Sequence, residues 1–375
     1  MKKDLSRRDF IKSATAMAMA TGVLLLPKKD VEAQELGYIS PVEARHYKKL
    51  SNKVVQCYRC PNFCKLKPGE RSFCRTRVNK NGKLYTYAYA NPCAVHIDPV
   101  EKKPLFHFLP GTQILSIATA GCTFRCKYCQ NWEISQFRPE ETVNYALSPQ
   151  EVVNLAIKYK TPSIASTYSE PTAFYEYMYD TSKLAHKREI RTTMHSNGSI
   201  NTKPLVELCE YLDAANIDLK FFDDEKYKRI SQGHFRTVLN TLKTLVKEGV
   251  HLEITNLLVP TLNDGEDEIS EMSHWIMDNL GPDIPLHFSR FYPMYKLKNL
   301  PPTPVKTLEI ARNIAMDAGL HYVYIGNVPG HPGENTYCPG CGKAVIKRTG
   351  YIITENNLKD GKCGFCGRKI TGVWK

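Results

Sequence analysis

The 375-residue sequence has no long apolar run, no nucleotide-binding glycine loop and no extended stretch of basic residues. The longest apolar stretch, Ala14–Leu26, is too short and too rich in Ala, Thr and Gly for a membrane span, so we expect no stable membrane-spanning helix. A Rossmann dinucleotide site is not expected either, because no Gly-x-Gly-x-x-Gly loop is present. The net charge of +13 invites a nucleic-acid interpretation, but without a basic run or a recognition motif we expect no nucleic-acid partner.

Cysteine, by contrast, is abundant, with 13 residues in the chain. Eleven of them fall into three groups whose short spacings suit metal chelation better than a disulfide framework. Cys93 and Cys209 stand apart, and Cys209 lies in a helical pattern typical of a small buried apolar residue. The three groups are Cys57, Cys60, Cys64 and Cys74; Cys122, Cys126 and Cys129; and Cys338, Cys341, Cys363 and Cys366.

The middle group organises the chain. An apolar strand, Ile114–Ala120, and a turn at Gly121 lead into Cys122, Cys126 and Cys129. Thiolates are the usual ligands of iron–sulfur clusters, and a cubic four-iron cluster normally takes four of them. Three ligands leave one iron open, and an open position can bind a chelating substrate. The alternative is a structural zinc or disulfide loop.

The N-terminus predicts an export signal. Arg7 and Arg8 precede the apolar run, and Val31–Ala33 offers a small-residue cleavage site. This pattern is typical of a twin-arginine signal over residues 1–33, so we expect the periplasm or cell surface, or the cytoplasm if the signal is not used. An amphipathic N-terminal helix is the alternative. The polar stretch Gln34–Asn52 predicts a linker.

The two outer cysteine groups predict metal sites. The N-terminal group, within a Cys-rich segment over residues 34–110, is interleaved with Pro and Gly and suits a compact knuckle that binds zinc or a second iron–sulfur cluster. Two disulfides are the remaining alternative. The C-terminal group forms two Cys-x2-Cys-Gly turns within residues 331–375, which indicates a zinc ribbon, with rubredoxin-like iron as the alternative. We expect this module to be structural or to dock a partner.

Between these groups, residues 111–330 alternate strand and helix six times, which predicts an α/β fold with a parallel barrel. The helices carry Pro near their starts and Gly at their ends. The expected strands are Ile114–Ala120, Ser163–Tyr168, Arg191–Ser196, Ala214–Leu219, His251–Val259 and Leu286–Phe291, and Tyr322–Ile325 is a further candidate. The expected helices are Pro149–Lys160, Thr172–Lys187, Thr202–Leu212, Phe235–Glu248, Glu266–Leu280 and Val305–Ala318.

The first of these strands ends in the cysteine loop, the next three end in polar residues, and the last two carry polar residues within them. Chemistry in a parallel barrel lies at the carboxyl ends of the strands, so we expect these residues to share one site with the cysteines. The pair Lys102 and Lys103, before the first strand, most simply forms a solvated face, but could also line an anionic pocket. The strand-end residues are Thr167–Thr172, His195–Gly198, Asp218–Lys220, Glu253, Thr255, Asn256, His287, Ser289 and Arg290.

Cys-x3-Cys-x-aromatic-Cys after an apolar strand resembles the signature of radical S-adenosylmethionine (SAM) enzymes, especially the group that activates pyruvate formate-lyase. The resemblance implies a partial (β/α)6 barrel and a [4Fe-4S] cluster whose open iron is chelated by SAM. It also implies that an electron from the cluster cleaves SAM to a 5′-deoxyadenosyl radical, which abstracts a hydrogen atom from the substrate.

The resemblance also assigns SAM contacts. Glu170 stands where the family has Gly-Gly-Glu-Pro and would accept from the SAM ammonium, although both glycines are missing here. Lys220, in an intact Asp-Leu-Lys motif, would meet the SAM carboxylate, and His287 would pack on the adenosine. Two departures are His195 in place of an Asp and Thr255 in place of an Arg. The implied cofactor-binding residues are Tyr128, Ser169, Glu170, Ser196, Asn197, Asp218, Lys220, Thr255 and His287.

A closer resemblance covers nearly the whole chain after the signal. The N-terminal knuckle, DPVEKKPLFHFLPGT, CQNWEISQ, NIDLKFF, HFSRFYPMY and GNVPGHPGENTYCPGC are similar to the radical SAM protein of the AmmeMemoRadiSam system. This implies Memo-like and AMMECR1-like protein partners and an electron donor, and leaves the substrate, a protein or a small molecule, unidentified. The competing hypothesis is an exported iron–sulfur or zinc protein that does not cleave SAM. A third, nucleic-acid modification, is favoured only by the charge and the zinc ribbon.

Overall fold

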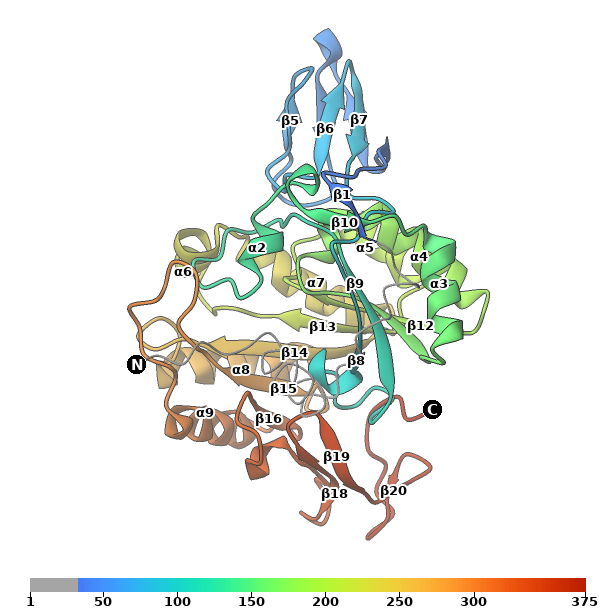
Figure 1. Ribbon diagram of the computed structural model, residues 1–375. Coiled ribbons are helices and arrows are strands. Elements are labelled where there is room, and N and C mark those ends of the chain that lie inside the picture. Colours follow the sequence, from blue (N-terminus) through green and yellow to red (C-terminus); the bar gives the residue numbers. More distant parts are fainter. Residues whose placement is uncertain (1–32) are drawn as a thin grey trace, which may run out of the picture.

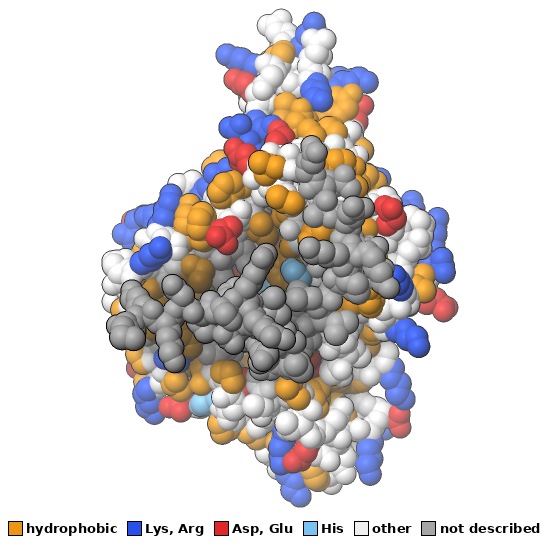
Figure 2. Space-filling model, in the orientation of Figure 1, with side chains coloured by type: hydrophobic (Ala, Val, Ile, Leu, Met, Phe, Trp, Pro, Cys, Tyr) orange, Lys and Arg blue, Asp and Glu red, His pale blue; other side chains and the backbone are white. Residues whose placement is uncertain are grey.

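The computed structural model describes residues 33–375, so the predicted export signal lies outside the described residues apart from Ala33. Figure 1 shows three layers: a group of short strands at one end, a large twisted sheet with helices in the middle, and a small stranded module at the other end. Lys and Arg side chains mark the tip of the N-terminal strands and the rim of the face seen in Figure 2. Within the described part of the chain, no helix is long and apolar enough to cross a membrane.

The central sheet has the strand order β16-β15-β14-β13-β12-β11-β9-β8. All neighbours from β9 to β16 run parallel, and β8 pairs antiparallel with β9 at one edge. Helices and loops cover the strands, and every residue of β11 is buried. The bounds are β8 Ala94–Pro99, β9 Gln113–Ala118, β11 Ser163–Ser166, β12 Arg191–Ser196, β13 Ala214–Asp218, β14 His251–Leu258, β15 Leu286–Arg290 and β16 Val323–Gly326.

The six predicted helices are confirmed with shifts of a few residues at their ends. The helix α3 begins as its sequence dictates: Ser148 caps the amide of Glu151, the Glu151 side chain returns to the Ser148 amide, and Pro149 occupies the first turn. The helix α4 begins later than predicted because Pro171–Phe174 forms a 3-10 turn before it. The helices are α3 Pro149–Lys158, α4 Tyr175–His186, α5 Thr202–Cys209, α7 Phe235–Lys247, α8 Glu266–Leu280 and α9 Val305–Asp317.

The sheet differs from the predicted six-stranded barrel in two ways. The further candidate after the sixth strand joins the sheet as β16, and β8 adds an antiparallel edge that no prediction included. In the described strand order β8 and β16 are the two edges and do not pair with each other. The described strands therefore form an open mixed sheet within an α/β fold, and closure into a barrel is not shown. The reason is topological: β8 comes directly before β9 and pairs with it, which covers the edge that a closed barrel would need.

The N-terminal strands belong to small antiparallel sheets that stand above the central one (Figure 1). The predicted linker, residues 34–52, is wrong in part, because its polar residues form edge strands. One sheet has the order β2-β7-β6, a second β3-β4-β5, and β1 pairs with β10. The bounds are β1 Ala33–Leu36, β2 Val42–Glu43, β3 Tyr47–Lys49, β4 Val55–Cys57, β5 Lys65–Leu66, β6 Arg77–Lys80, β7 Lys83–Thr86 and β10 Val143–Tyr145.

The C-terminal module consists of β17 (Thr336–Tyr337), β18 (Ala344–Thr349) and β19 (Ile352–Asn356), followed by the pair β20 (Leu358–Lys359) and β21 (Lys362–Cys363). Its four cysteine sulfurs lie within 4.8 Å of one another. The closest pairs, Cys338–Cys366 at 3.6 Å and Cys341–Cys363 at 3.7 Å, match four ligands around one ion with metal–sulfur bonds of about 2.3 Å. The module could therefore bind one metal ion.

The module is attached to the sheet through His107. The His107 ring is fully buried and lies 2.5 Å from both the Thr371 carbonyl oxygen and the Tyr324 hydroxyl. The backbone of Val373 pairs with His107 and with Leu109. Burial lowers the pKa of His107 to about 4, although the nearby Glu253 carboxylate acts in the opposite direction. The imidazole is therefore neutral in the folded protein at neutral and mildly acidic pH.

This burial predicts an acid-sensitive attachment. Between pH 6.5 and 4 the unfolded chain takes up a proton at His107 that the folded chain does not. The free energy of unfolding should therefore fall by up to about 3 kcal/mol as the pH is lowered through this window. Urea unfolding at a series of pH values measures the slope. His107→Phe should flatten it, and an unchanged slope in that variant would rule out His107 as the cause.

Candidate functional site

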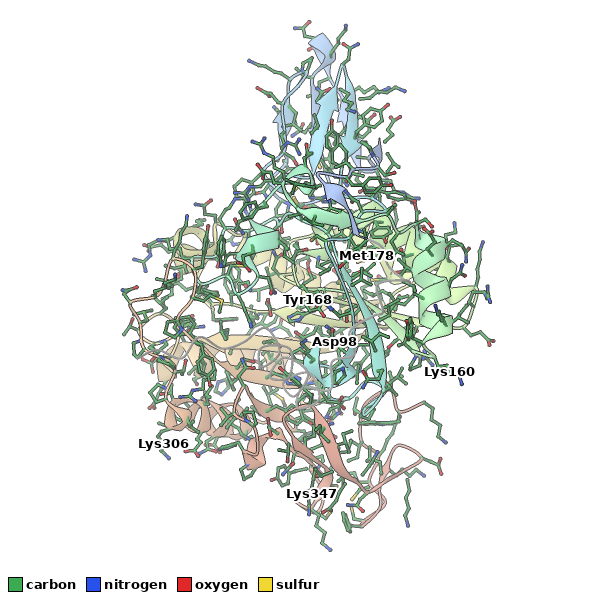
Figure 3. The ribbon with its side chains drawn as sticks, viewed as in Figure 1. Asp98, Lys160, Tyr168, Met178, Lys306 and Lys347 are labelled. Carbon is green, nitrogen blue, oxygen red and sulfur yellow. The ribbon has the colours of Figure 1, made fainter. Side chains whose placement is uncertain are left out.

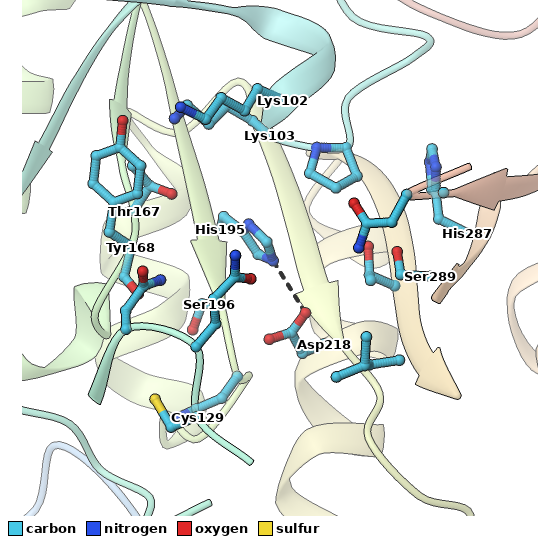
Figure 4. Close-up of a pocket in the computed structure, with 18 of the residues that line it drawn as sticks. Lys102, Lys103, Cys129, Thr167, Tyr168, His195, Ser196, Asp218, His287 and Ser289 are labelled. Atoms are coloured by element: carbon cyan, nitrogen blue, oxygen red, sulfur yellow. Dashed lines mark hydrogen bonds and ion pairs between the residues drawn. The ribbon is translucent and has the colours of Figure 1, made fainter. Parts of the chain in front are cut away.

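A cavity of about 470 Å³ opens at the carboxyl ends of the parallel strands (Figure 4). The structure brings together there the three cysteines of the loop after β9 and all nine residues predicted to contact SAM. Besides Cys122, Cys126 and Cys129, these are Tyr128, Ser169, Glu170, Ser196, Asn197, Asp218, Lys220, Thr255 and His287.

The cysteine loop is held by hydrogen bonds to its sulfurs. The Cys122 sulfur accepts from the backbone N–H of Phe124 at 3.3 Å and from Asn197 Nδ2 at 3.6 Å. The Cys129 sulfur lies 3.1 Å from the Ser135 hydroxyl. Donors of this kind stabilise sulfur ligands that carry negative charge.

Without a metal these thiols stay protonated. Burial, with Glu170 and Cys126 nearby, raises the pKa of Cys122 well above its usual value. Burial also raises the pKa of Cys126 to about 11, and Lys220 opposes this only in part. Ionised thiols in this loop therefore need the positive charge of a metal centre, which is how metal binding and thiol ionisation are coupled.

The spacing of the three sulfurs fits a cluster better than one ion. Within residues 33–375, one group of His, Cys, Asp or Glu side chains is close enough to hold a single ion. It is the four C-terminal cysteines, whose ligand atoms all lie within 4.8 Å of one another, and the three loop cysteines do not form such a group. A four-iron cluster binds each thiolate on a different iron, which separates the sulfurs. Among the described cysteines, only these three line the cavity. The residues present therefore fit a [4Fe-4S] cluster, and three cysteines would leave one of its irons without a protein ligand.

Glu170 ties the second strand to the third. Its Oε1 accepts from the Ser196 hydroxyl at 2.7 Å and from the Thr172 amide at 2.9 Å, and its Oε2 accepts from the Asn197 amide at 2.9 Å. The side chain is buried. A carboxylate offers about four lone-pair sites, so Glu170 keeps room for one more donor, such as an ammonium group.

Asp218, His195 and Lys220 form a polar triad at the ends of the neighbouring strands β12 and β13. The Asp218 carboxylate lies 3.0 Å from His195 Nε2, the dashed contact in Figure 4, and 2.8 Å from Lys220 Nζ. Burial raises the pKa of Asp218, but Lys220 and His195 outweigh it and bring the pKa far below the usual range. Burial lowers the pKa of Lys220, but Asp218, Cys126 and Tyr128 outweigh burial and raise the pKa well above its usual value. Lys220 therefore stays charged beside the cysteines.

The deeper wall carries the remaining predicted contacts. His287 Nε2 lies 2.6 Å from Glu253, and its ring stacks on Tyr324 and meets Phe106 edge-on. The Thr255 hydroxyl donates to Asn216 Oδ1 at 2.9 Å. These two positions are thus braced by the protein itself, and adenosine packing by His287 stays a prediction.

Two groups of cavity residues are absent from the predicted SAM contacts. Lys102 and Lys103, expected most simply on a solvated face, line the cavity instead, and both pair with Asp98, at 2.9 and 2.5 Å. That they bind an anion there stays a prediction. The Tyr168 hydroxyl also donates to Asp98, and Figure 3 places these two near the centre of the molecule. Burial lowers the pKa of Lys103 to about 8, although Asp98 opposes this.

The second unassigned group comes from the C-terminal part of the chain. Glu334, Gly350 and Tyr351 line the same cavity as the loop cysteines. The module expected to be structural or partner-docking therefore also shapes the site. No local pattern in the sequence signals this, because only the folded chain brings residue 351 to the cavity that residue 168 also lines.

Comparison with known proteins places this site in a family. Residues 116–275 match the model of the radical SAM superfamily. An uncharacterized protein of Methanocaldococcus jannaschii is 49% identical over 332 residues, which cover 88% of this chain and 98% of that protein. The chain belongs to the radical SAM superfamily.

More distant relatives are named pyruvate formate-lyase-activating enzymes. The enzyme of Staphylococcus epidermidis is 24% identical over 239 residues, which cover 59% of this chain and 92% of that enzyme. Among solved structures, a radical SAM methyltransferase from Sphaerobacter thermophilus has a TM-score of 0.49 at 13% identity, over 79% of this chain and 80% of that chain. Membership of the superfamily implies a [4Fe-4S] cluster and SAM, and this is consistent with the cavity and its three cysteines.

The triad makes a testable prediction for this radical SAM site. Asp218→Asn removes the charge that holds Lys220 and His195, and hydrogen bonds to charged groups contribute about 1.5–3 kcal/mol each. We expect SAM to bind at least about tenfold more weakly in equilibrium binding to anaerobically reconstituted protein. Asp283→Asn is the matched control, because Asp283 forms a similar pair with His321, at 2.8 Å, away from the cavity. Equal binding by both variants would contradict the assignment.

Proposed function

We propose that this protein is a radical SAM enzyme of the activating-enzyme type. A cluster at Cys122, Cys126 and Cys129 would supply the electron that cleaves SAM, so that a hydrogen atom is abstracted from a protein or small-molecule substrate. The observation that carries the proposal is that the three thiols of the loop open on the same cavity as Glu170 and Lys220.

The charges of the cavity suit the amino-acid end of SAM. Glu170 would accept a hydrogen bond from its ammonium, and Lys220 would neutralise its carboxylate. Because Glu170 is fixed by Ser196 and Asn197, and Lys220 by Asp218, neither group needs to reorganise when the ligand binds. Glu170 is buried and the Lys220 side chain is only 13% exposed, so little water competes with either interaction.

The test is product formation under reducing, oxygen-free conditions. Reconstituted wild-type protein given dithionite and SAM should form 5′-deoxyadenosine and methionine. The competing proposal, an exported iron–sulfur or zinc protein without this activity, predicts a bound cluster and no 5′-deoxyadenosine. Absence of the product from protein that contains about four irons and four sulfides at the cysteine loop would therefore overturn our proposal.

We also propose zinc for the C-terminal site, because the four sulfurs surround one point at distances typical of a tetrahedral ion. Metal analysis should find about one zinc per chain that is lost in Cys338→Ala. Iron in its place, with the optical spectrum of rubredoxin, would favour the alternative.

For location and partners, we propose twin-arginine export and assembly with Memo-like and AMMECR1-like proteins and an electron donor. A reporter fused to residues 1–40 should be exported only while Arg7 and Arg8 are intact. Co-purification with the two candidate proteins tests the partners, and a chain that is neither exported nor bound contradicts both proposals.

A further inference from the structure

The N-terminal cysteine group lies at the base of the short strands, and all its members are free thiols. Two fully buried arginines accompany them. Arg59 Nη2 donates to the Cys74 sulfur at 3.1 Å, and Arg77 Nη1 donates to the Cys57 sulfur at 3.3 Å. The sequence left zinc, an iron–sulfur cluster and two disulfides open for this group, and these contacts help to choose among them.

Arg59 has no carboxylate of its own. The buried Glu176 pairs with Arg77 at 2.5 Å and attracts Arg59 only from a greater distance, and no carboxylate of residues 33–375 lies within ion-pair distance of Arg59, whose other donor goes to the Ala173 carbonyl at 3.1 Å. Two buried guanidinium groups therefore share one carboxylate, and the buried positive charge that is left over is strongly unfavourable. Neutral thiols and disulfides do not offset the charge, whereas a metal–thiolate centre, with its net negative charge, does.

The sulfur spacing then separates iron–sulfur from zinc. In one molecule, the C-terminal cysteines meet the distance for a single ion, whereas no three of the N-terminal four do so among the described residues. In this respect the N-terminal group resembles the three cysteines of the cavity loop. Four thiolates on four separate irons satisfy the wider spacing and the negative charge together.

Each of the four sulfurs also has a hydrogen-bond donor, as is usual for cluster ligands whose potential the protein adjusts. Asn62 Nδ2 lies 3.8 Å from the Cys60 sulfur, and the Phe73 amide donates to the Cys64 sulfur at 3.4 Å. The Cys74 sulfur contacts two hydroxyl groups in addition to Arg59. These are Ser72 Oγ at 3.0 Å and Thr76 Oγ1 at 3.2 Å.

This group directly adjoins the cysteine loop of the cavity. Gly121, the residue before Cys122, has a φ of +100°, and a Cβ there would lie 2.7 Å from the Cys74 carbonyl oxygen. Asn62, which contacts Cys60, also donates to the Thr123 carbonyl at 3.3 Å. The two cysteine groups are therefore in backbone contact.

We propose that Cys57, Cys60, Cys64 and Cys74 bind a second four-iron cluster, which passes single electrons to the cluster at the cavity loop. In the transfer the N-terminal cluster is oxidised by one electron and the cavity cluster is reduced by one, and a low-potential one-electron donor protein then reduces the N-terminal cluster again. The relay rests on the proposed function, whereas the identity of the N-terminal centre does not.

Metal content tests the centre first. The triple variant Cys122→Ala, Cys126→Ala, Cys129→Ala, reconstituted without oxygen, should keep about four irons and four sulfides and, when reduced, the electron paramagnetic resonance signal of a four-iron cluster. Wild type and Cys209→Ala should contain about eight irons. Zinc without sulfide in the triple variant would overturn the proposal. About four irons in wild type would also overturn it, and this second result does not depend on whether the triple variant folds.

Arg59 provides a second readout that a merely structural role would not move. In the triple variant, Arg59→Met should shift the midpoint potential of the remaining cluster to a more negative value, because the reduced cluster loses a positive neighbour, and Arg59→Lys should restore most of the difference. Equal potentials in all three proteins would contradict the role of Arg59.

The relay is tested with Cys57→Ala, Cys60→Ala. With dithionite, a small reductant, this variant should still form 5′-deoxyadenosine. With a reduced ferredoxin, the variant should form it at least tenfold more slowly than wild type does with the same ferredoxin. Equal rates with ferredoxin would overturn the relay. If wild type contains two clusters but forms no 5′-deoxyadenosine with either reductant, the proposed function fails and the second cluster stands.

Discussion

Replacing Cys126 with Ala should reduce SAM cleavage to below about 1% of the wild-type rate. Cys126 is buried in the loop after β9 and is one of three thiols at the cavity, and no fourth described cysteine lines the cavity to replace it. Loss of an outer-shell partner alone typically costs 10–100-fold in metal affinity or activity, so loss of a ligand should cost more. The measurement is 5′-deoxyadenosine formed per chain under dithionite, with iron and sulfide counted on the same sample.

Cys209→Ala is the matched control for this variant. Cys209 lies at the end of α5, outside all three cysteine groups, and should tolerate the change with wild-type activity. An active Cys126→Ala protein with a full complement of iron would mean that another side chain completes the cluster, and the assignment of the three ligands would then be wrong.

Glu176→Gln should lower the free energy of unfolding by about 3–5 kcal/mol. Glu176 is buried against Arg77, which is fully buried, and it also accepts from the Arg45 amide at 2.7 Å. Breaking a buried pair by removing one partner is costly because the other charge stays uncompensated. Urea unfolding of wild type and variant measures the difference at neutral pH.

The acid dependence of the same pair has a defined sign. Burial raises the pKa of Glu176, but Arg77 and Arg59 outweigh it, so the folded pKa lies below the usual value of 4.5. The stabilisation is therefore present above pH 4.5 and is lost as the pH falls through the lower, folded pKa. The control is Glu140→Gln, because the Arg71–Glu140 pair is partly exposed and should contribute at most about 1 kcal/mol. Similar losses in both variants would contradict this account.

Much of the fold and site could be predicted from local patterns. Strand and helix alternate with clear Pro and Gly punctuation, and parallel strands place their ends at one edge of a sheet. Residues far apart in the chain, such as Glu170, Lys220 and His287, could therefore be expected around one cavity, and all of them line it. The short cysteine spacings predicted metal sites because chelation needs ligands close in space, and the four C-terminal sulfurs do lie within 4.8 Å of one another.

The remainder depends on packing between distant segments. Nothing near Tyr351 in the sequence indicates that it reaches the cavity, and nothing near Arg59 indicates that it is buried beside Cys74 without an ion-pair partner of its own. The antiparallel edge strand β8 was missed because a parallel barrel was expected to begin at β9. In each case tertiary contacts decide the role, and no periodicity in the sequence records them.

The most direct test is whether SAM binds the cluster at the cavity. Wild-type protein is reduced without oxygen, and the paramagnetic resonance spectrum of its cavity cluster is recorded before and after SAM is added, with Cys57→Ala, Cys60→Ala used to remove the signal of the other group. We predict that SAM changes the spectrum, because one iron is left open by three cysteines. A spectrum that SAM leaves unchanged, or a loop that contains zinc and no sulfide, would contradict the account.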